Sequence, residues 1–291
     1  MPAPTQPETL LSPKQQAHAA AMRQLVQAAI ADLARQIGAG HTDGYLEMLA
    51  FYRKFWRYSA RNLVLIKCQR PDATRVAGYH TWQTLGRQVQ KGSTAIWIWC
   101  PIIAKRRDPD TGEETQACLG FRPGSVFDAA DLEDIDNSPL PTLWRPLPDD
   151  CEDAYWRVLR AIGDTGLAIT EQALPGGLLG KATAEGIVVS SRIPDSRNRL
   201  ATLLHEYAHC LAHFGPVAQG KDERQCEMEA ESACYVVLTH LGIDYPFSRD
   251  YLLHHRVTPD LLYQSLAAVQ GIVKRMMRAV EGAKGESNQA A

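Results

Sequence analysis

Two histidines and one glutamate in the C-terminal half of the chain have the spacing of a metal site. The sequence LATLLHEYAHCLAH, residues 200–213, places His205 and His209 four apart, so a helix would present both imidazoles on one face. Glu206 follows the first histidine. In this H-E-x-x-H pattern the histidines bind Zn²⁺, and the glutamate takes a proton from a bound water. The spacing predicts a metal centre with Glu206 as the catalytic base.

The alternative is an amphipathic helix that carries two histidines by coincidence. Its other positions are largely apolar, and burying unpaired imidazoles and a carboxylate there would be costly without a cation. His213 continues the four-residue series, but eight residues of helix rise ~12 Å, too far for His205 and His213 to share an ion at bonds of ~2.1 Å. We therefore expect His213 to cap or line the site and the third ligand to come from another segment.

That third ligand is expected in the helical segment from Asp222 to Gly242. Glu227 and Glu231 lie on one face of it, whereas Glu229 points elsewhere. The pair resembles the E-x-x-x-[D/E] spacing of glutamate-type zincins. The resemblance implies Glu227 as the third ligand and Glu231 as the support of a ligating histidine, with the reverse assignment left open. Zn²⁺ is the expected cofactor, and Mn²⁺ is an alternative divalent transition metal.

The composition is that of an ordinary soluble globular protein. The 291 residues are 45% hydrophobic and 22% charged, and the chain is long enough for two domains. There is no run of 18 apolar residues, and the N-terminus lacks the basic and apolar regions of a secretory signal. Seven scattered cysteines without C-x-x-C spacing argue against a disulfide framework. We expect a cytoplasmic protein that does not bind a membrane.

The net charge of −2 conceals two blocks of opposite sign. Between Arg53 and Arg107 there are twelve Lys and Arg but one acid, Asp72, a local balance of +11. Residues 108–153 hold thirteen acids and two arginines. A basic block followed by an acidic block indicates different tasks along the chain.

Aromatic residues accompany the basic block. Ten of them lie between Tyr45 and Trp99. Together with the cations they would suit single-stranded nucleic acid, because bases stack on aromatic faces while Lys and Arg follow the phosphates. The alternative is that several of them form the core, since Trp97 and Trp99 share one face of a predicted strand.

Short motifs in this region resemble a known family. Ser59-x-x-Asn62, Gln69-x-Pro71 and the run VAGYHTWQTLGRQVQKG, followed by a hydrophobic strand ending in Pro101, closely resemble the N-terminal domain of plasmid antirestriction proteins of the ArdC type. The similarity covers roughly residues 15–128. It implies single-stranded DNA as a partner, with contacts from the residues at matching positions: Asn62, Tyr79, Trp82, Arg87 and Lys91.

Periodicity and turn residues predict an α+β protein of two domains. Helices are expected at 13–38, 44–57, 151–163, 222–242 and 259–280, with a short one around Asn62, and strands at 95–104, 116–127, 167–170 and 186–191, the first two joined by a turn at 108–112. The domains are a small α+β single-stranded-DNA-binding domain with a β-hairpin, 13–128, and a zincin-like domain with the H-E-x-x-H helix, 150–281. An acidic, proline-rich linker is expected at 129–149, and disordered tails at 1–12 and 282–291.

Residues 150–280 look like the zincin-type metallopeptidase domain that accompanies this module in ArdC-like and phage polyvalent proteins. The resemblance implies a zinc metallopeptidase tethered to a single-stranded-DNA-binding domain, with an unknown protein substrate, protecting incoming plasmid or phage DNA from host restriction. We expect the strand at 187–191 to be an edge to which a peptide adds, and Tyr207, Tyr235 or His240 to stabilise the oxyanion. One alternative is a non-catalytic protein that coats single strands and has a structural or vestigial metal site. Another is a regulator that cleaves or binds one host repressor.

Overall fold

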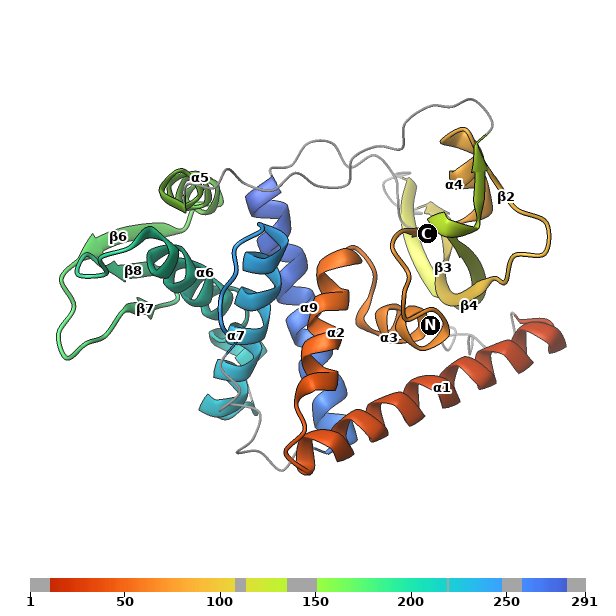
Figure 1. Ribbon diagram of the computed structural model, residues 1–291, viewed down its shortest axis with the longest axis horizontal. Coiled ribbons are helices and arrows are strands. Elements are labelled where there is room, and N and C mark those ends of the chain that lie inside the picture. The colour runs from red at the N-terminus through yellow and green to blue at the C-terminus, as the bar shows by residue number, and fades with distance from the viewer. Residues whose placement is uncertain (1–10, 108–113, 135–150, 219, 248–257, 282–291) are drawn as a thin grey trace. The chain divides into compact units, whose positions relative to one another are not determined.

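The structure, a computed structural model, describes residues 11–107, 114–134, 151–218, 220–247 and 258–281. Helices and small sheets make up the chain, as expected for an α+β protein (Figure 1). Contacts divide it into two compact units, and the boundary between them falls within α1 (Pro13–Gly38). Among the described residues the first unit takes 11–29 and 61–134, and the second takes 30–60 and 151–281. The expected turn at 108–112, the tail at 282–291 and most of the tail at 1–12 lie outside the described residues.

A long antiparallel hairpin organises the first unit. Its strands are β3 (Ile96–Arg107) and β4 (Glu114–Asp128). Ile96 and Ile98 are buried on one face, because alternate residues of a strand point the same way. The register shifts between Ile102 and Ile103, which is the position of a bulge that bends a strand. The remaining elements of this unit are α3 (Ala60–Gln69), β1 (Val76–Ala77) beside β4, α4 (Tyr79–Thr84), β2 (Arg87–Val89), η2 (Ala129–Asp131) and β5 (Leu132–Asp134).

Part of the segment expected to be a linker is folded into this unit. β5 pairs with β2, and η2 precedes it. The cause lies in Asp128, which is 1% exposed and whose carboxylate accepts hydrogen bonds from the backbone N–H groups of Thr74, Arg75 and Ala130. The linker prediction is therefore wrong for residues 129–134, while 135–149 lie outside the described residues.

The second unit consists of packed helices and a small sheet. α6 (Ser196–Ala212), α7 (Glu223–His240) and α9 (Pro259–Glu281) lie side by side (Figure 1). α5 (Cys151–Gly163) packs on α6, and η3 (Gly215–Ala218) follows α6. None of the helices that the structure describes is long and apolar enough to cross a membrane.

α2 (Asp43–Lys54) also belongs by its contacts to this second unit. The Tyr45 hydroxyl lies 2.9 Å from Ser232 Oγ on α7, and the Tyr52 hydroxyl donates to the carbonyl of Leu266 on α9 at 3.3 Å. Both tyrosines are fully buried, so they belong to the core and not to a surface that stacks bases. The contact units therefore divide the chain differently from the expected ranges 13–128 and 150–281.

The small sheet places β8 (Gly186–Ser190) in the middle. It runs parallel to β6 (Ala168–Gln172) and antiparallel to β7 (Gly180–Ala182). The expectation that residues 187–191 form an open edge is therefore wrong, because both sides of β8 are paired. β7, which sequence analysis did not identify, lies at the edge of the sheet and contacts α6.

Candidate metal centre

Two capped helices carry the candidate residues. α6 begins at Asp195, whose carboxylate accepts the N–H of Asn198 at 2.9 Å, and α7 begins at Asp222, which accepts the N–H of Gln225 at 2.8 Å. The apolar positions of α6 are buried and fix the rotation of that helix. Its polar positions 205, 206 and 209 are left partly accessible.

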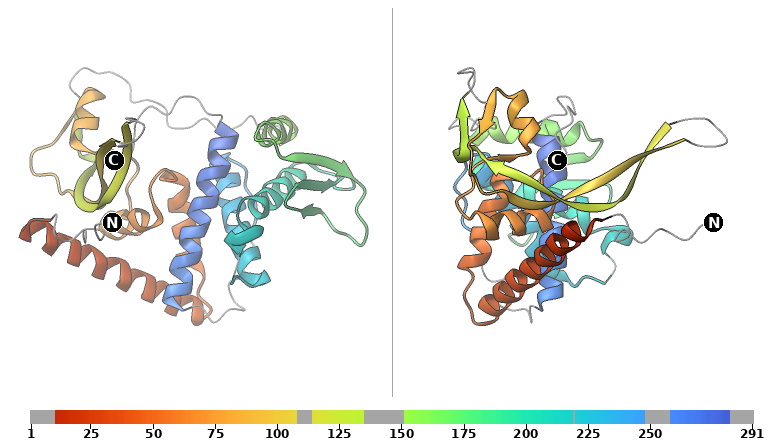
Figure 2. Two further views of the ribbon diagram at one scale, coloured as in Figure 1. Left: turned by 180° about the vertical axis from the view of Figure 1, so that it is seen from behind. Right: turned by 90° about the vertical axis from the view of Figure 1, so that its right-hand side faces the viewer.

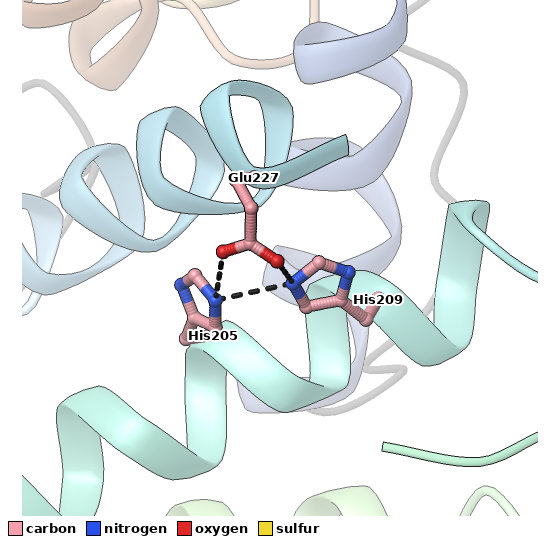
Figure 3. Close-up of side chains that lie close together, drawn as sticks. All are labelled: His205, His209 and Glu227. Atoms are coloured by element: carbon pink, nitrogen blue, oxygen red, sulfur yellow. Dashed lines mark hydrogen bonds and ion pairs between the residues drawn. The ribbon is translucent and has the colours of Figure 1, made fainter. Parts of the chain in front are cut away.

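The imidazoles of His205 and His209 face the carboxylate of Glu227, which reaches them from α7 (Figure 3). The two Nε2 atoms are 3.1 Å apart. Glu227 places Oε2 3.3 Å from His205 Nε2 and Oε1 3.2 Å from His209 Nε2. Ligands bound at ~2.0–2.1 Å around a tetrahedral ion lie about 3.3 Å from one another. The triangle of donor atoms therefore fits one divalent ion and leaves a fourth position for another ligand.

Glu231 lies on the outer side of this triangle. Its Oε2 is 3.5 Å from Nδ1 of His205, the ring nitrogen that does not face Glu227. The geometry thus brings Glu227 to the donor atoms and Glu231 to the far nitrogen of His205. The reverse assignment, which the sequence left open, does not fit these positions.

Hydrogen bonds within the triangle shift the pKa values of His205 and Glu227 in opposite directions. Burial lowers the pKa of His205, but its hydrogen bonds to Glu227 and Glu231 outweigh burial and raise that pKa to about 9. The hydrogen bonds from His205 and His209 in turn hold the pKa of Glu227 well below its ordinary value. These contacts favour a proton on His205, and an ion that binds there must displace it.

Glu206 lies between the histidines and the edge strand β7. Burial raises the pKa of its carboxyl, and the N–H of Ala182 donates a hydrogen bond to it. A Cβ at Gly180 would stand 2.6 Å from Thr202 Cγ2 and 2.8 Å from Glu206 Oε1, so the strand passes directly against these side chains. Only glycine permits that approach at position 180.

The three candidate oxyanion donors contact residues outside this triangle. Tyr207 is 3% exposed and bonds to the Thr165 side chain. His240 Nε2 lies 3.2 Å from Glu281 Oε1, and the Tyr235 ring packs edge-on against Phe247. Polar atoms of Tyr207 and His240 are thus engaged with other residues, whereas a role for the Tyr235 hydroxyl stays a prediction.

His213 is the residue that caps the end of α6, as expected, but sequence analysis missed its partner. Its ring lies between His209 and Glu229, a carboxylate with no exposed surface. An acid on the face of α7 that also carries Ala233 and Val236 was the available signal, but its partners come from other segments and could not be assigned from spacing.

Of the residues implied to contact DNA, three are buried in the first unit. Asn62 is 5% exposed and bonds to the backbone of Trp99, and Trp82 is fully buried with its indole N–H donated to the Phe127 carbonyl. Arg87 is 6% exposed. Asn62 and Trp82 therefore have a structural role in this unit, whereas contact of these three residues with DNA stays a prediction. Tyr79 and Lys91 are exposed.

Comparison with known proteins agrees with this architecture. Residues 16–127 match the family described as the N-terminal domain of anti-restriction factor ArdC. The uncharacterized protein pXO2-81 of Bacillus anthracis is 26% identical over 246 residues, which are 69% of this chain but 41% of that protein. The chain therefore spans less than half the length of this curated relative.

Two crystal structures of the antirestriction protein ArdC from plasmid R388 have the same fold. The metal-free structure matches with a TM-score of 0.54 at 18% identity, covering 88% of this chain and 98% of that one. The Mn(II)-bound structure matches with a TM-score of 0.50 at 17% identity, covering 89% and 99%. Residues 16–127 thus carry an ArdC-type N-terminal domain, and the chain resembles the R388 protein in fold.

Proposed function

We propose that this protein is a metallopeptidase joined to a single-stranded-DNA-binding domain, and that it protects incoming DNA of a mobile element from host restriction. The observation that carries the proposal is the donor triangle of His205, His209 and Glu227 beside the buried carboxyl of Glu206. Two nitrogens and one carboxylate oxygen are the donor set of catalytic zinc sites, which keep one position open.

Each residue has a distinct task in the proposed reaction. His205, His209 and Glu227 would hold the ion, and Glu231 would orient His205 from its far nitrogen. When bound, the ion supplies a Lewis acid that polarises a carbonyl and lowers the pKa of a water. Glu206, whose pKa burial already raises, takes a proton from the attacking water and passes it to the leaving amine.

The open edge of β7 is the proposed binding site for the peptide. The Leu179 carbonyl accepts the N–H of Ser190, so the backbone groups of Leu179 and Lys181 point to β8. Those of Gly180 and Ala182 then point to the open side, where Ala182 already donates to Glu206. A peptide that adds to this edge would cross the carboxyl of Glu206.

The relatives support the biological part of the proposal. The R388 protein with the same fold is described as an antirestriction protein and has been solved with Mn(II) bound. We therefore expect a divalent transition metal, Zn²⁺ or Mn²⁺, at the corresponding place in this chain.

The test compares Glu206→Gln with the wild-type chain. Both are incubated with Zn²⁺ or Mn²⁺, with and without single-stranded DNA, and cleavage of the chain itself and of unfolded proteins is followed. Loss of the carboxylate should lower the cleavage rate by at least ~100-fold, since proton transfer contributes ~10²–10⁴-fold. Glu223→Gln, an exposed position on α7, is the matched control and should cleave as wild type. Equal rates for wild type and Glu206→Gln under every condition would refute the peptidase.

The second candidate is a non-catalytic protein that coats single strands. The middle of the hairpin favours it, because Phe121 and Leu119 are each 51% exposed and the cation Arg122, next in sequence, is also exposed. Under this alternative, protection of incoming DNA in a restricting host survives Glu206→Gln but not loss of Phe121 and Arg122.

A further inference from the structure

Two exposed leucines lie next to the open edge of β7. Leu178 is 48% exposed and Leu179 is 54% exposed, whereas Ile187 and Val189 of the neighbouring strand β8 are buried. A single exposed leucine is ordinary on a protein surface. Two in succession at a strand edge form an apolar patch where another chain can pair its backbone. Their place beside this edge indicates a role in binding.

The loop between β6 and β7 fixes the position of these leucines (Figure 1). Gly176 and Gly177 have φ angles of 65° and 78°, a left-handed conformation that glycine adopts at no steric cost. The N–H of Leu178 donates to the Pro175 carbonyl at 3.2 Å, which closes the turn. The turn thus delivers Leu178 and Leu179 directly to the start of the edge strand.

Alternation along β7 places Leu179 and Lys181 on one face of the sheet. A Cβ at Gly180 would stand 2.8 Å from Glu206 Oε1, so position 180 faces α6. Leu179 belongs to the same ladder, because its carbonyl accepts the N–H of Ser190. Successive side chains of a strand point to opposite faces. The side chains of Leu179 and Lys181 therefore stand on the face away from α6, where both are exposed.

A peptide that pairs with this edge would meet both side chains. A peptide residue opposite Gly180 would direct its side chain toward Glu206. The residues before and after it would point the other way, one beside Leu179 and one beside Lys181. Directly opposite side chains of paired strands have Cβ atoms ~4.5–5.5 Å apart, close enough for apolar contact and for attraction between opposite charges.

We propose that Leu179 and Lys181 select the peptides that this edge accepts, namely extended segments with an apolar and an acidic side chain two positions apart. The apolar side chain covers Leu179, with Leu178 extending the surface, and the carboxylate pairs with the ammonium of Lys181. The inference rests on the proposed function and adds its substrate class. The substrate is an unfolded or flexible segment, because only such a segment has backbone groups available to pair with an edge.

The test measures peptide binding apart from cleavage. Fluorescence anisotropy follows labelled peptides with the full-length Glu206→Gln variant and Zn²⁺, so that the peptides stay intact. They carry Leu and Glu two positions apart, in both orders because an edge can pair in either direction. In matched peptides Ser replaces Leu, or Lys replaces Glu. The better Leu and Glu peptide should bind about 5–20-fold more tightly than its Ser form, as expected for a partly buried leucine. It should bind about 2–5-fold more tightly than its Lys form, as expected for an exposed ion pair.

Two further substitutions in this variant assign each preference to a residue. Leu179→Ser should bring the Leu and Ser peptides within about twofold of each other, and Lys181→Glu should reverse the preference for Glu over Lys. Trp156→Ser and Arg157→Glu are the matched controls. They change an exposed aromatic residue and an exposed cation of α5, and they should keep both preferences.

A preference that survives the substitution of its residue would overturn the role of that residue, and equal or absent binding of all peptides would overturn the inference. Cleavage of the same peptides by the wild-type chain judges the proposed peptidase separately. Cleavage of all peptides at equal rates would support the peptidase and refute the selection. Binding that depends on Leu179 and Lys181, without cleavage under any condition, would refute the peptidase and leave the selection standing.

Discussion

At the scale of single residues, the side chain of Asn62 pairs with the backbone of β3. Its amide donates to the Trp99 carbonyl and accepts the Trp99 N–H, both at 2.9 Å, as a neighbouring strand would. Gln69 does the same at Trp97. Asn62→Ala should therefore lower the free energy of unfolding by about 2–4 kcal/mol, because it leaves two buried backbone groups unpaired. Denaturant unfolding measures this change.

The same variant separates the structural role of Asn62 from a role in binding. Folded Asn62→Ala should bind a single-stranded oligonucleotide as tightly as wild type at temperatures well below its melting point. Asn198→Ala, at an exposed position, is the control and should change stability by no more than about 0.5 kcal/mol. Loss of DNA affinity in a stably folded Asn62→Ala variant would indicate that Asn62 contacts DNA.

The role of a residue could be predicted where it depends on local helix geometry, and could not where it depends on contacts with other segments. His205 and His209 share a face because helix geometry alone sets that spacing, so the motif was sufficient. Resemblance to a family transfers the identity of Asn62 and Trp82 but not their burial, which depends on β3 and β4. Glu229 could not be assigned, because its partners Lys221 and His213 come from outside α7.

At the scale of elements, the long helices were predictable and the short strands were not. α5 was expected at 151–163 and is observed at Cys151–Gly163, since apolar periodicity over three turns is a strong signal. β7 is three residues long, Gly180–Ala182, too short to show alternation. β8 has a paired strand on each side. Its run of apolar residues could not reveal this, because β7 was not identified from the sequence.

The packing of β7 against α6 yields a prediction for Gly180. Gly180→Ala adds a Cβ where Thr202 and Glu206 already stand, so the strand must move off the helix. Peptide cleavage should fall by about 100-fold, the usual effect of misplacing reacting groups by ~1 Å. Metal affinity should stay near that of wild type, because the donor atoms come from α6 and α7.

Gly271→Ala is the control for this prediction. Gly271 lies on α9, where its Cβ would meet nothing within 4 Å beyond the neighbouring backbone of that helix, and the added methyl favours a helix. Kinetics of cleavage and chelator competition are measured on both variants. Unchanged cleavage by Gly180→Ala would mean that β7 is not the edge that binds the peptide.

At the scale of the whole molecule, the family match and the contact units do not coincide. The match covers residues 16–127, yet α2 lies within that range, packs on α7 and bonds to α9 through Tyr52. Tyr45, Leu49 and Tyr52 of α2 are fully buried there. A fragment that ends near Asp149 would expose them, so its loss of solubility would say nothing about DNA binding. The DNA-binding proposal is therefore better tested in the full chain.

The hairpin of the first unit provides that test. Its outer half extends away from α3 and α4 (Figure 2), and Phe121 and Arg122 are exposed on β4. Phe121→Ala with Arg122→Ala should weaken binding to a single-stranded oligonucleotide by about 5–100-fold, as expected for one stacked base and one phosphate contact. The dependence of log affinity on log salt should become shallower by about 0.7.

Trp156→Ala is the control. It removes an aromatic ring that is 45% exposed in the second unit, and it should leave the affinity and its salt dependence unchanged. Fluorescence anisotropy over a salt series measures both, and an unaltered slope in the double variant would exclude the hairpin from the DNA-binding surface.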